Sequence, residues 1–284
     1  MRRSFCCVLA LALCIAVLPE RTSADTIAID FEGYALGAIP NGFQGWQITN
    51  PGWDQAVTNV SPISGAQSWR ISSLVGSGSF GDHPFSPALS QAAGESTTGA
   101  PTNFFTASMD FRPLASNTTG DGVTISIDRG DGARGNWMRI DNTAAGWELQ
   151  AFDYDGSAFV FSTLASLADD VTHNLRFDMT FVDGLQNDIW NIYLDNALLF
   201  TGVGWEDFFV DFQPGNNPPL AYDRLLFRNS ASLAGSVGVL FDNLTYSSGL
   251  AAAAVPEPAS LALWSLAGIV GLHGARRQRK ARSA

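Results

Sequence analysis

Two short segments of the chain place a tryptophan directly before acidic residues, a combination that suits the binding of sugars. They are Trp53-Asp54 and Trp205-Glu206-Asp207. An indole ring offers a flat apolar face for stacking, and nearby carboxylates accept hydrogen bonds from hydroxyl groups. We expect both segments to be loops that leave these side chains accessible. The five residues are therefore candidate ligand-binding residues.

Arg70 is a sixth candidate, because it lies on the next predicted strand and can pair with one of these acids. A structural ion pair explains Arg70 equally well, since a buried pair needs no ligand. The same choice applies to the tryptophans. Trp69, Trp147 and Trp190 fall in runs of alternating polarity, and this pattern predicts that they belong to the core.

Two acidic residues near the ends of the predicted domain are candidate ligands of a structural calcium ion. Glu32 follows the first predicted strand, and Asp242 lies in the last one. Calcium takes several oxygen ligands from loops, and the first and last strands of a sandwich can meet at such a site. Acidic residues at strand ends are also common without a metal, so both explanations stay open.

The acidic and histidine side chains do not form a recognisable catalytic set. Glycoside hydrolysis needs two carboxyl groups about 5–10 Å apart, one of them usually protonated. His83 and His173 have no Ser or Asp partner in a recognisable motif. We therefore predict no catalytic residue, with a secreted polysaccharide hydrolase or lyase as the alternative. A Glu-x-Asp-x-x-Glu strand would supply such a pair, but no two of the glutamates in the domain show that spacing. These glutamates are Glu32, Glu95, Glu148 and Glu206.

Charge is distributed unevenly along the 284 residues, whose formal net charge is −11. The stretch 25–254 contains eight arginines, no lysine and 25 acidic residues, a net charge of −17. Such a domain repels nucleic acid and anionic membranes, so neither is expected as a partner.

The N-terminus has the parts of a secretory signal peptide. Arg2 and Arg3 precede an apolar run over 5–18, and residues 22–24 are small, as signal peptidase requires. We expect cleavage after Ala24. All three cysteines lie in this segment, so the mature protein has neither a disulfide nor a thiolate site. These cysteines are Cys6, Cys7 and Cys14.

The C-terminus has three parts. Val255-Pro256-Glu257-Pro258 contains two prolines that keep the backbone out of helices and sheet ladders, so it stays extended. An apolar run over 261–275 predicts a hydrophobic helix that is short for a bilayer core of about 30 Å. A basic cluster then holds the end of the chain in the cytoplasm. The cluster consists of Arg276, Arg277, Arg279, Lys280 and Arg282.

This succession of a Pro-Glu-Pro motif, an apolar span and a basic end resembles the PEP-CTERM sorting signal of Gram-negative bacteria. The resemblance covers residues 255–282, which follow a Gly- and Ala-rich linker over 248–254. It implies recognition by an exosortase, a membrane protease or transpeptidase, and transfer of the protein to the cell surface or an extracellular polymer. An ordinary membrane anchor is the alternative, and the protein then still faces outward.

Between these ends, the hydrophobic pattern over 25–247 repeats every two residues. Val123, Ile125 and Ile127 alternate with polar residues, and the run 190–201, with Asn196-Ala197 in its loop, predicts a hairpin. Such alternation is typical of antiparallel sheets with one face on a core. We therefore predict a single all-β domain, an antiparallel β-sandwich of more than ten strands.

The predicted domain resembles the jelly rolls of the concanavalin A/laminin G-like kind. Asp30-Phe31-Glu32, Tyr193-Leu194-Asp195-Asn196 and Phe241-Asp242-Asn243 carry this likeness. Together, the two resemblances imply an exported cell-surface or matrix protein with a non-catalytic jelly-roll domain. Its expected partners are signal peptidase, an exosortase and an extracellular polysaccharide as the candidate ligand.

Overall fold

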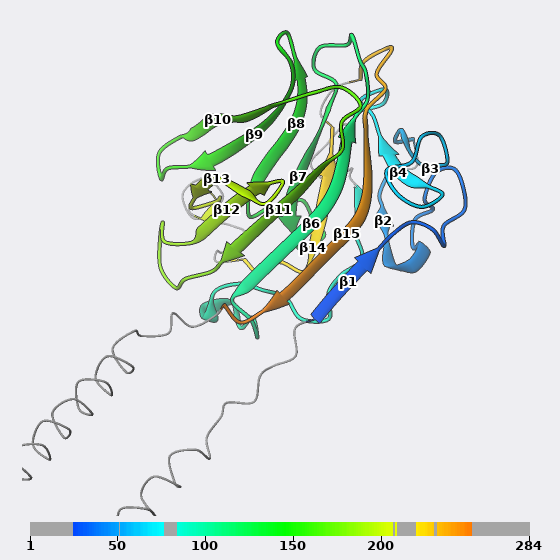
Figure 1. Ribbon diagram of the computed structural model, residues 1–284. Coiled ribbons are helices and arrows are strands. Elements are labelled where there is room, and N and C mark those ends of the chain that lie inside the picture. Colours follow the sequence, from blue (N-terminus) through cyan, green and yellow to red (C-terminus); the bar gives the residue numbers. More distant parts are fainter. Residues whose placement is uncertain are drawn as a thin grey trace, which may run out of the picture. The chain divides into compact units, whose positions relative to one another are not determined.

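Two antiparallel β-sheets pack against each other in the computed structural model (Figure 1). The predicted all-β antiparallel sandwich is therefore confirmed. The predicted signal peptide and sorting tail lie outside the residues that the structure describes. The described residues are 25–50, 52–76, 84–206, 208, 220–229 and 232–251.

One sheet has eight strands and contains both the first and the last strand of the domain. Its strands are β1 (Asp25–Ile29), β3 (Gln55–Thr58), β4 (Ser68–Ile71), β6 (Phe104–Pro113), β11 (His173–Thr180), β12 (Ile189–Leu194), β13 (Ala197–Gly202) and β15 (Val239–Gly249). Their order is β13-β12-β11-β6-β15-β4-β3, and β1 also pairs with β15. Strand β15 runs two residues beyond the predicted domain boundary at 247.

The other sheet has seven strands. They are β2 (Gln47–Ile48), β5 (Pro84–Phe85), β7 (Gly122–Asp128), β8 (Trp137–Thr143), β9 (Gly146–Tyr154), β10 (Phe159–Leu167) and β14 (Arg224–Arg228). Their order is β10-β9-β8-β7-β14-β5-β2. Short 3₁₀ turns at Phe43–Gly45 and Ser96–Thr98 lie in the connections.

The predicted hairpin at 190–201 is confirmed, with its turn one residue earlier than expected. Strands β12 and β13 pair antiparallel, and Asp195 and Asn196 form the turn with φ angles of 50° and 68°. Two successive residues with positive φ match the right-handed twist of the strands they join. Asp and Asn tolerate this conformation because their short side chains form local hydrogen bonds.

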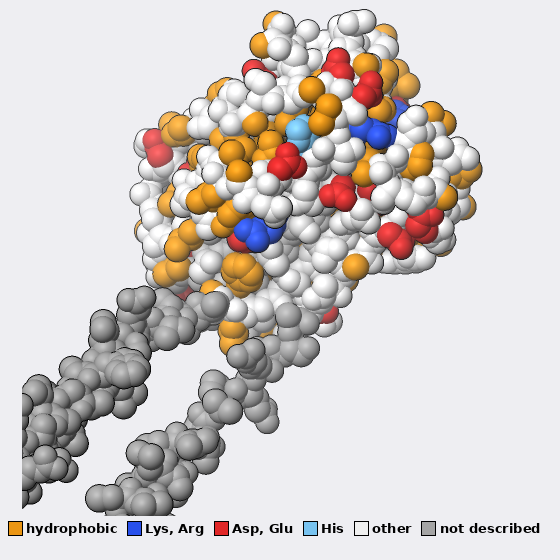
Figure 2. Space-filling model, in the orientation of Figure 1, with side chains coloured by type: hydrophobic (Ala, Val, Ile, Leu, Met, Phe, Trp, Pro, Cys, Tyr) orange, Lys and Arg blue, Asp and Glu red, His pale blue; other side chains and the backbone are white. Residues whose placement is uncertain are grey.

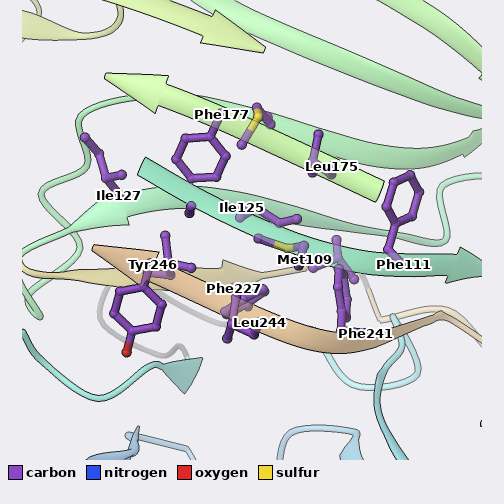
Figure 3. Close-up of a cluster of buried hydrophobic side chains, with 14 of the residues drawn as sticks. Met109, Phe111, Ile125, Ile127, Leu175, Phe177, Phe227, Phe241, Leu244 and Tyr246 are labelled. Carbon is purple, nitrogen blue, oxygen red and sulfur yellow. The ribbon is translucent and has the colours of Figure 1, made fainter. Parts of the chain in front are cut away.

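The core lies between the two sheets and is built from the apolar members of the alternating runs. Figure 3 shows Met109 and Phe177 of the eight-stranded sheet together with Ile125 and Phe227 of the seven-stranded sheet. All four side chains are fully buried. Burying an apolar side chain of this size contributes roughly 1.5–3 kcal/mol, so this layer fixes the register of both sheets.

Tryptophans fill much of this layer. Trp69, Trp147 and Trp190 are each at most 1% exposed, which confirms their predicted place in the core. The ring of Trp69 packs 4.9 Å from the rings of both Trp46 and Phe227. These contacts join loop residues near the N-terminus to strands of both sheets.

Candidate functional site

The seven-stranded sheet buries the outer side chains of its central strand β7 as well as the inner ones. The outer residues Thr124, Ser126 and Asp128 are 3%, 0% and 0% exposed. On the eight-stranded sheet, the outer residues Thr106 and Ser108 of β6 are partly exposed. The alternation alone suggests two similar solvent-facing surfaces. On the outer face of the seven-stranded sheet, which we call the recessed face, the side chains of β7 are instead buried.

Cross-strand register aligns five polar side chains into one row on this recessed face. Gln150 of β9 lies between Arg139 of β8 and Thr163 of β10. Thr124 of β7 lies between Arg139 and Arg228 of β14. Because neighbouring strands are about 4.8 Å apart, the row spans roughly 19 Å across the sheet. We call these five residues the polar row.

Three aromatic side chains form a second row on the same face. Phe152 of β9 lies between Phe161 of β10 and Trp137 of β8, with ring centroids 4.9 and 5.4 Å away. Phe161 is 50% exposed, while Phe152 and Trp137 are partly buried. This aromatic row is two residues along each strand from the polar row, a separation of about 7 Å in an extended chain.

Hydrogen bonds tie the two rows together and orient the polar side chains. The Trp137 indole Nε1–H donates to Thr124 Oγ1 at 2.9 Å. Glu148, two residues before Gln150 on β9, accepts hydrogen bonds from Gln150 Nε2 at 2.8 Å and from Thr163 Oγ1 at 3.3 Å. These bonds fix the side chains before any ligand arrives, which reduces the entropy lost on binding.

Positive charge on this face is partly removed from water. Burial lowers the pKa of Arg228, and burial also lowers the pKa of Arg134 to about 10. The Arg134 guanidinium lies 4.9 Å from the centre of the Trp137 ring. Arg139 pairs with Asp141 at 2.8 Å. Burial raises the pKa of Asp141, and the neighbouring Arg139 only partly offsets this effect.

Several buried polar atoms near β7 retain hydrogen-bonding capacity. Among the described residues, Ser126 Oγ, Asn136 Nδ2 and Asp128 Oδ2 have no hydrogen-bond partner. The other oxygen of Asp128 accepts from the backbone N–H groups of Gly130, Asp131 and Gly132. Burial raises the pKa of Asp128 to about 6. Unsatisfied buried groups are rare and are often found where a protein carries out its function.

Of the residues singled out in the sequence, Asp54 and Arg70 do pair. The Arg70 guanidinium binds both carboxylate oxygens of Asp54, at 2.7 and 2.9 Å. Burial alone raises the pKa of Asp54, but hydrogen bonds from Arg70 and Ser72 outweigh this effect and lower it. The ion pair, one of the two interpretations of Arg70, is thus present, and it joins strand β4 to the turn before β3.

Trp53 and Trp205 are both only 4% exposed, so the structure places their rings inside the domain. The Trp205 indole N–H donates to the carbonyl of Phe152 at 2.9 Å. Its ring lies 5.2 Å from Trp137. Trp205 therefore packs beside the aromatic row, against Trp137 and against Phe159 of β10, which lies two residues before Phe161 on the same face. Neither Trp53 nor Trp205 offers the open face that sugar stacking requires.

Glu206 lines a cavity of about 10 Å³ together with Glu95, Asp188 and the ring of Tyr222. Burial raises the pKa of Tyr222 well above 10, and nearby carboxylates add to the effect. A volume of this size holds about one water molecule, so the acids that meet here are not placed around a sugar. Asp207 lies outside the described residues.

Glu32 and Asp242, the candidate calcium ligands, hold the same turn at 64–68. Glu32 accepts from the backbone N–H groups of Ala66 and Gln67. Asp242 is fully buried and accepts from Ser64 and from the Ser68 hydroxyl. Protein donors thus explain both carboxylates. Within the described residues, no group of three or more His, Cys, Asp or Glu is arranged to hold a metal ion.

The sorting motif at 255–258 and the basic cluster at 276–282 lie outside the described residues. Within the part of the chain that the structure describes, no helix is long and apolar enough to cross a membrane. Export and sorting therefore rest on the sequence alone.

The sequence did not single out Trp137, Arg139, Gln150, Thr163 or Arg228. One signal was present, because the polar side of 137–141 carries a tryptophan, an arginine and an aspartate. The row itself depends on the register of five strands, which the sequence pattern does not give.

No protein-family model matches the chain, and no curated protein matches it. Among solved structures, it is similar to an alginate lyase, Aly36B, with 14% identity over 78% of this chain and 96% of that one, at a TM-score of 0.51. Weaker matches include carbohydrate-binding module CBM66 from Bacillus subtilis, with 14% identity over 71% of this chain and 94% of that one, at a TM-score of 0.36. The globular domain of T. cruzi calreticulin shows 11% identity over 79% of this chain and 88% of that one, at a TM-score of 0.43. At this level of identity, the likeness to the lyase shows the fold, which is a concanavalin A-like jelly-roll β-sandwich.

Proposed function

We propose that this chain is an exported surface or matrix protein whose sandwich domain binds polysaccharide without altering it. The ligand lies on the recessed outer face of the seven-stranded sheet. The observation that carries this proposal is the position of the aromatic row beside the polar row. Aromatic rings support the apolar faces of sugar rings. Arg139, Arg228 and Thr163, whose side chains stay partly or fully exposed, bind the hydroxyl groups at their edges. The buried Gln150 and Thr124 hold the row in place.

Affinity electrophoresis through gels that contain one polysaccharide each tests this proposal. The exported protein should be retarded by at least one polymer. We expect Trp137→Ala and Arg139→Gln each to weaken that retention about tenfold, because each removes a contact of roughly 1–1.5 kcal/mol. The proposal fails if both variants are retained as strongly as the parent.

The other sheet offers matched controls. Tyr193 and Arg176 lie on the outer face of the eight-stranded sheet, with the guanidinium 3.9 Å from the ring centre. Tyr193→Ala and Arg176→Gln remove the same kinds of side chain from a face outside the two rows. We expect the gel to retain both variants as strongly as the parent. Weaker retention of Trp137→Ala and Arg139→Gln then cannot be explained by the loss of any ring or any positive charge.

The same incubations test the alternative of a polysaccharide-acting enzyme. Reducing ends are released by a hydrolase, and unsaturated sugars by a lyase. A binding protein releases neither, and it leaves the length distribution of the polymer unchanged. Product formation that Trp137→Ala abolishes would place a reaction on this face and replace binding as its role.

The handling of the chain is a separate part of the proposal and rests on its two ends. Signal peptidase removes residues 1–24, and an exosortase recognises Val255-Pro256-Glu257-Pro258 and releases the domain to the surface or matrix. Mass spectrometry of the surface-released protein checks this directly. No peptide beyond about residue 258 is expected, and recovery of Arg282 in the released protein would contradict processing.

A further inference from the structure

A cleft of about 550 Å³ opens on the outer face of the eight-stranded sheet, on the opposite side of the sandwich from the two rows. Arg70 of β4, Leu240 of β15 and Arg112 of β6 lie next to one another in register and form its floor. Ser61, Leu114 and Asp170 contribute to its walls. Figure 2 looks onto this face and shows that basic side chains are few there.

The two arginines of the cleft differ in whether a carboxylate neutralises their positive charge. Arg70 is neutralised by its two-fold contact with Asp54. Arg112 donates a hydrogen bond to the carbonyl of Ser61 and forms no ion pair with any described residue. By contrast, five arginines of the domain each pair with an aspartate. These are Arg70, Arg129, Arg139, Arg176 and Arg224.

An uncompensated guanidinium in a cleft is notable in a domain with a net charge of −17. Arginine binds carboxylates through two parallel hydrogen bonds, which gives both strength and orientation. The apolar side chains of Leu114 and Leu240 lie beside it. The cleft therefore combines one available positive charge with an apolar floor, a pairing that suits an anionic ligand with an apolar face.

Asp170 adds a negative group that limits which anions fit. Its backbone N–H donates to the carbonyl of Pro113 at 2.8 Å, which fixes the turn at the end of β6. Its carboxylate accepts hydrogen bonds from hydroxyl groups and repels ligands with several charges. A ligand with a single carboxylate and several hydroxyl groups satisfies both Arg112 and Asp170.

We infer that this cleft is a second binding site, which takes a uronic acid unit of an acidic polysaccharide. Arg112 binds the carboxylate, and Asp170 and Ser61 bind hydroxyl groups. The partly exposed Leu114 and the exposed Val60 contact the apolar face of the ring, and the buried Leu240 lies beneath. The volume lies within the range of about 300–1,000 Å³ that is usual for small-molecule sites. If the recessed face on the other sheet also binds polysaccharide, one domain can bridge two polymer chains. This bridging rests on the proposed function, whereas the assignment of the cleft as a uronate site is independent of it.

Isothermal titration of the exported protein with a trisaccharide that contains one galacturonate and two galactose units, and with a neutral galactose trimer, tests this inference. We expect the uronate to bind more tightly than the neutral trimer. Arg112→Gln should weaken uronate binding by about tenfold to a hundredfold, because a hydrogen bond to a charged group is worth roughly 1.5–3 kcal/mol. Equal affinity for the two trimers overturns the assignment, as does uronate binding that Arg112→Gln leaves unchanged.

Two further variants keep the test independent of folding and of the other face. Asp170→Ala removes the carboxylate that accepts hydrogen bonds from the hydroxyl groups, so we expect weaker binding of the uronate; unchanged or tighter binding contradicts the role given to Asp170 in the cleft. Trp137→Ala lies on the opposite sheet and should leave uronate affinity intact. If Trp137→Ala abolishes uronate binding while Arg112→Gln does not, the uronate occupies the recessed face and the cleft inference fails, although the proposed function stands.

Discussion

The outer faces of the two sheets follow the same alternation of polar and apolar residues, yet they differ in how their polar groups are satisfied. On the eight-stranded sheet, side chains pair with each other across strands. Asp110 accepts from both Asn174 and Asn243 at 2.8 Å, and Thr106 donates to Asp178 at 2.7 Å. Those contacts give the face a structural role and leave the cleft at Arg112 as its distinctive feature.

On the seven-stranded sheet, the polar residues are buried more deeply and are less completely paired. Ser126, Asp128 and Asn136 each keep one buried polar atom without a partner among the described residues. A buried polar group without a hydrogen bond lowers the stability of the folded protein by more than a typical hydrogen bond raises it. Several such groups on one face therefore reduce the net stabilisation that the face contributes. The comparison shows that the two outer faces differ in how completely their polar groups are satisfied, and not in polarity itself.

The largest effect is expected from Trp205, which packs beside the aromatic row against Trp137 and Phe159. Trp205→Ala should reduce the free energy of unfolding by about 3–5 kcal/mol, because it leaves a cavity beside Trp137 and removes the hydrogen bond to the carbonyl of Phe152. Urea unfolding followed by fluorescence measures this loss. A decrease below about 1 kcal/mol would show that the indole is not a support of this face.

Asp128 provides the second test, through the dependence of stability on pH. Its pKa is about 6 in the folded protein and about 3.9 in an unfolded chain. Between these values the folded state binds the extra proton, so stability is greatest at low pH and falls as pH rises to about 6. Asp128→Asn cannot ionise and should be more stable than the parent at pH 8, by up to about 3 kcal/mol.

This advantage should shrink when the two proteins are compared at pH 4.5, where the parent carboxyl is mostly protonated in the folded state. Urea unfolding at both pH values gives the difference. An Asp128→Asn variant that is less stable than the parent at pH 8 would mean that the charge of Asp128 is stabilised, for instance by Arg134, more than burial disfavours it.

The alternating pattern was sufficient to predict the layers of this fold. Period-two runs such as Val123-Thr124-Ile125 place one set of side chains on a core whatever the strand order. The hairpin at 190–201 was predictable because its turn residues and both strands are contiguous. The Asp54–Arg70 pair was one of two interpretations, and it joins β4 to the residue before β3, the strand that precedes β4 in the chain. These features all depend on local information.

What the pattern could not give is how each face is covered and which strands are neighbours. Trp53 and Trp205 were expected to be accessible because they lie in loops, but those loops fold back onto the domain and bury both rings. The polar row needs residues 124 to 228 in register, a long-range property. Arg139 became a candidate only when its neighbours Gln150 and Thr124 were known.

Asp110 tests the outer face of the eight-stranded sheet. Its replacement should change stability less than replacement of Trp205 or Asp128. Asp110→Ala removes the acceptor of two side-chain amides, so we expect a loss of about 1 kcal/mol in the free energy of unfolding. Asn174 and Asn243 can then turn to water, because this face is partly open. A loss above about 3 kcal/mol would show that the eight-stranded face is as sensitive to missing partners as the recessed one.

The smallest effect is expected from metal removal at Glu32 and Asp242. A calcium ion present at a hundred times its Kd adds about 2.7 kcal/mol of stability, which is a shift of several degrees in Tm. Because both carboxylates accept hydrogen bonds from the 64–68 turn, we expect Tm to be the same with EDTA as with added calcium. A drop of several degrees in EDTA that Asp242→Asn abolishes would instead assign a metal to this end of the eight-stranded sheet, and would make its satisfied polar groups part of a binding site.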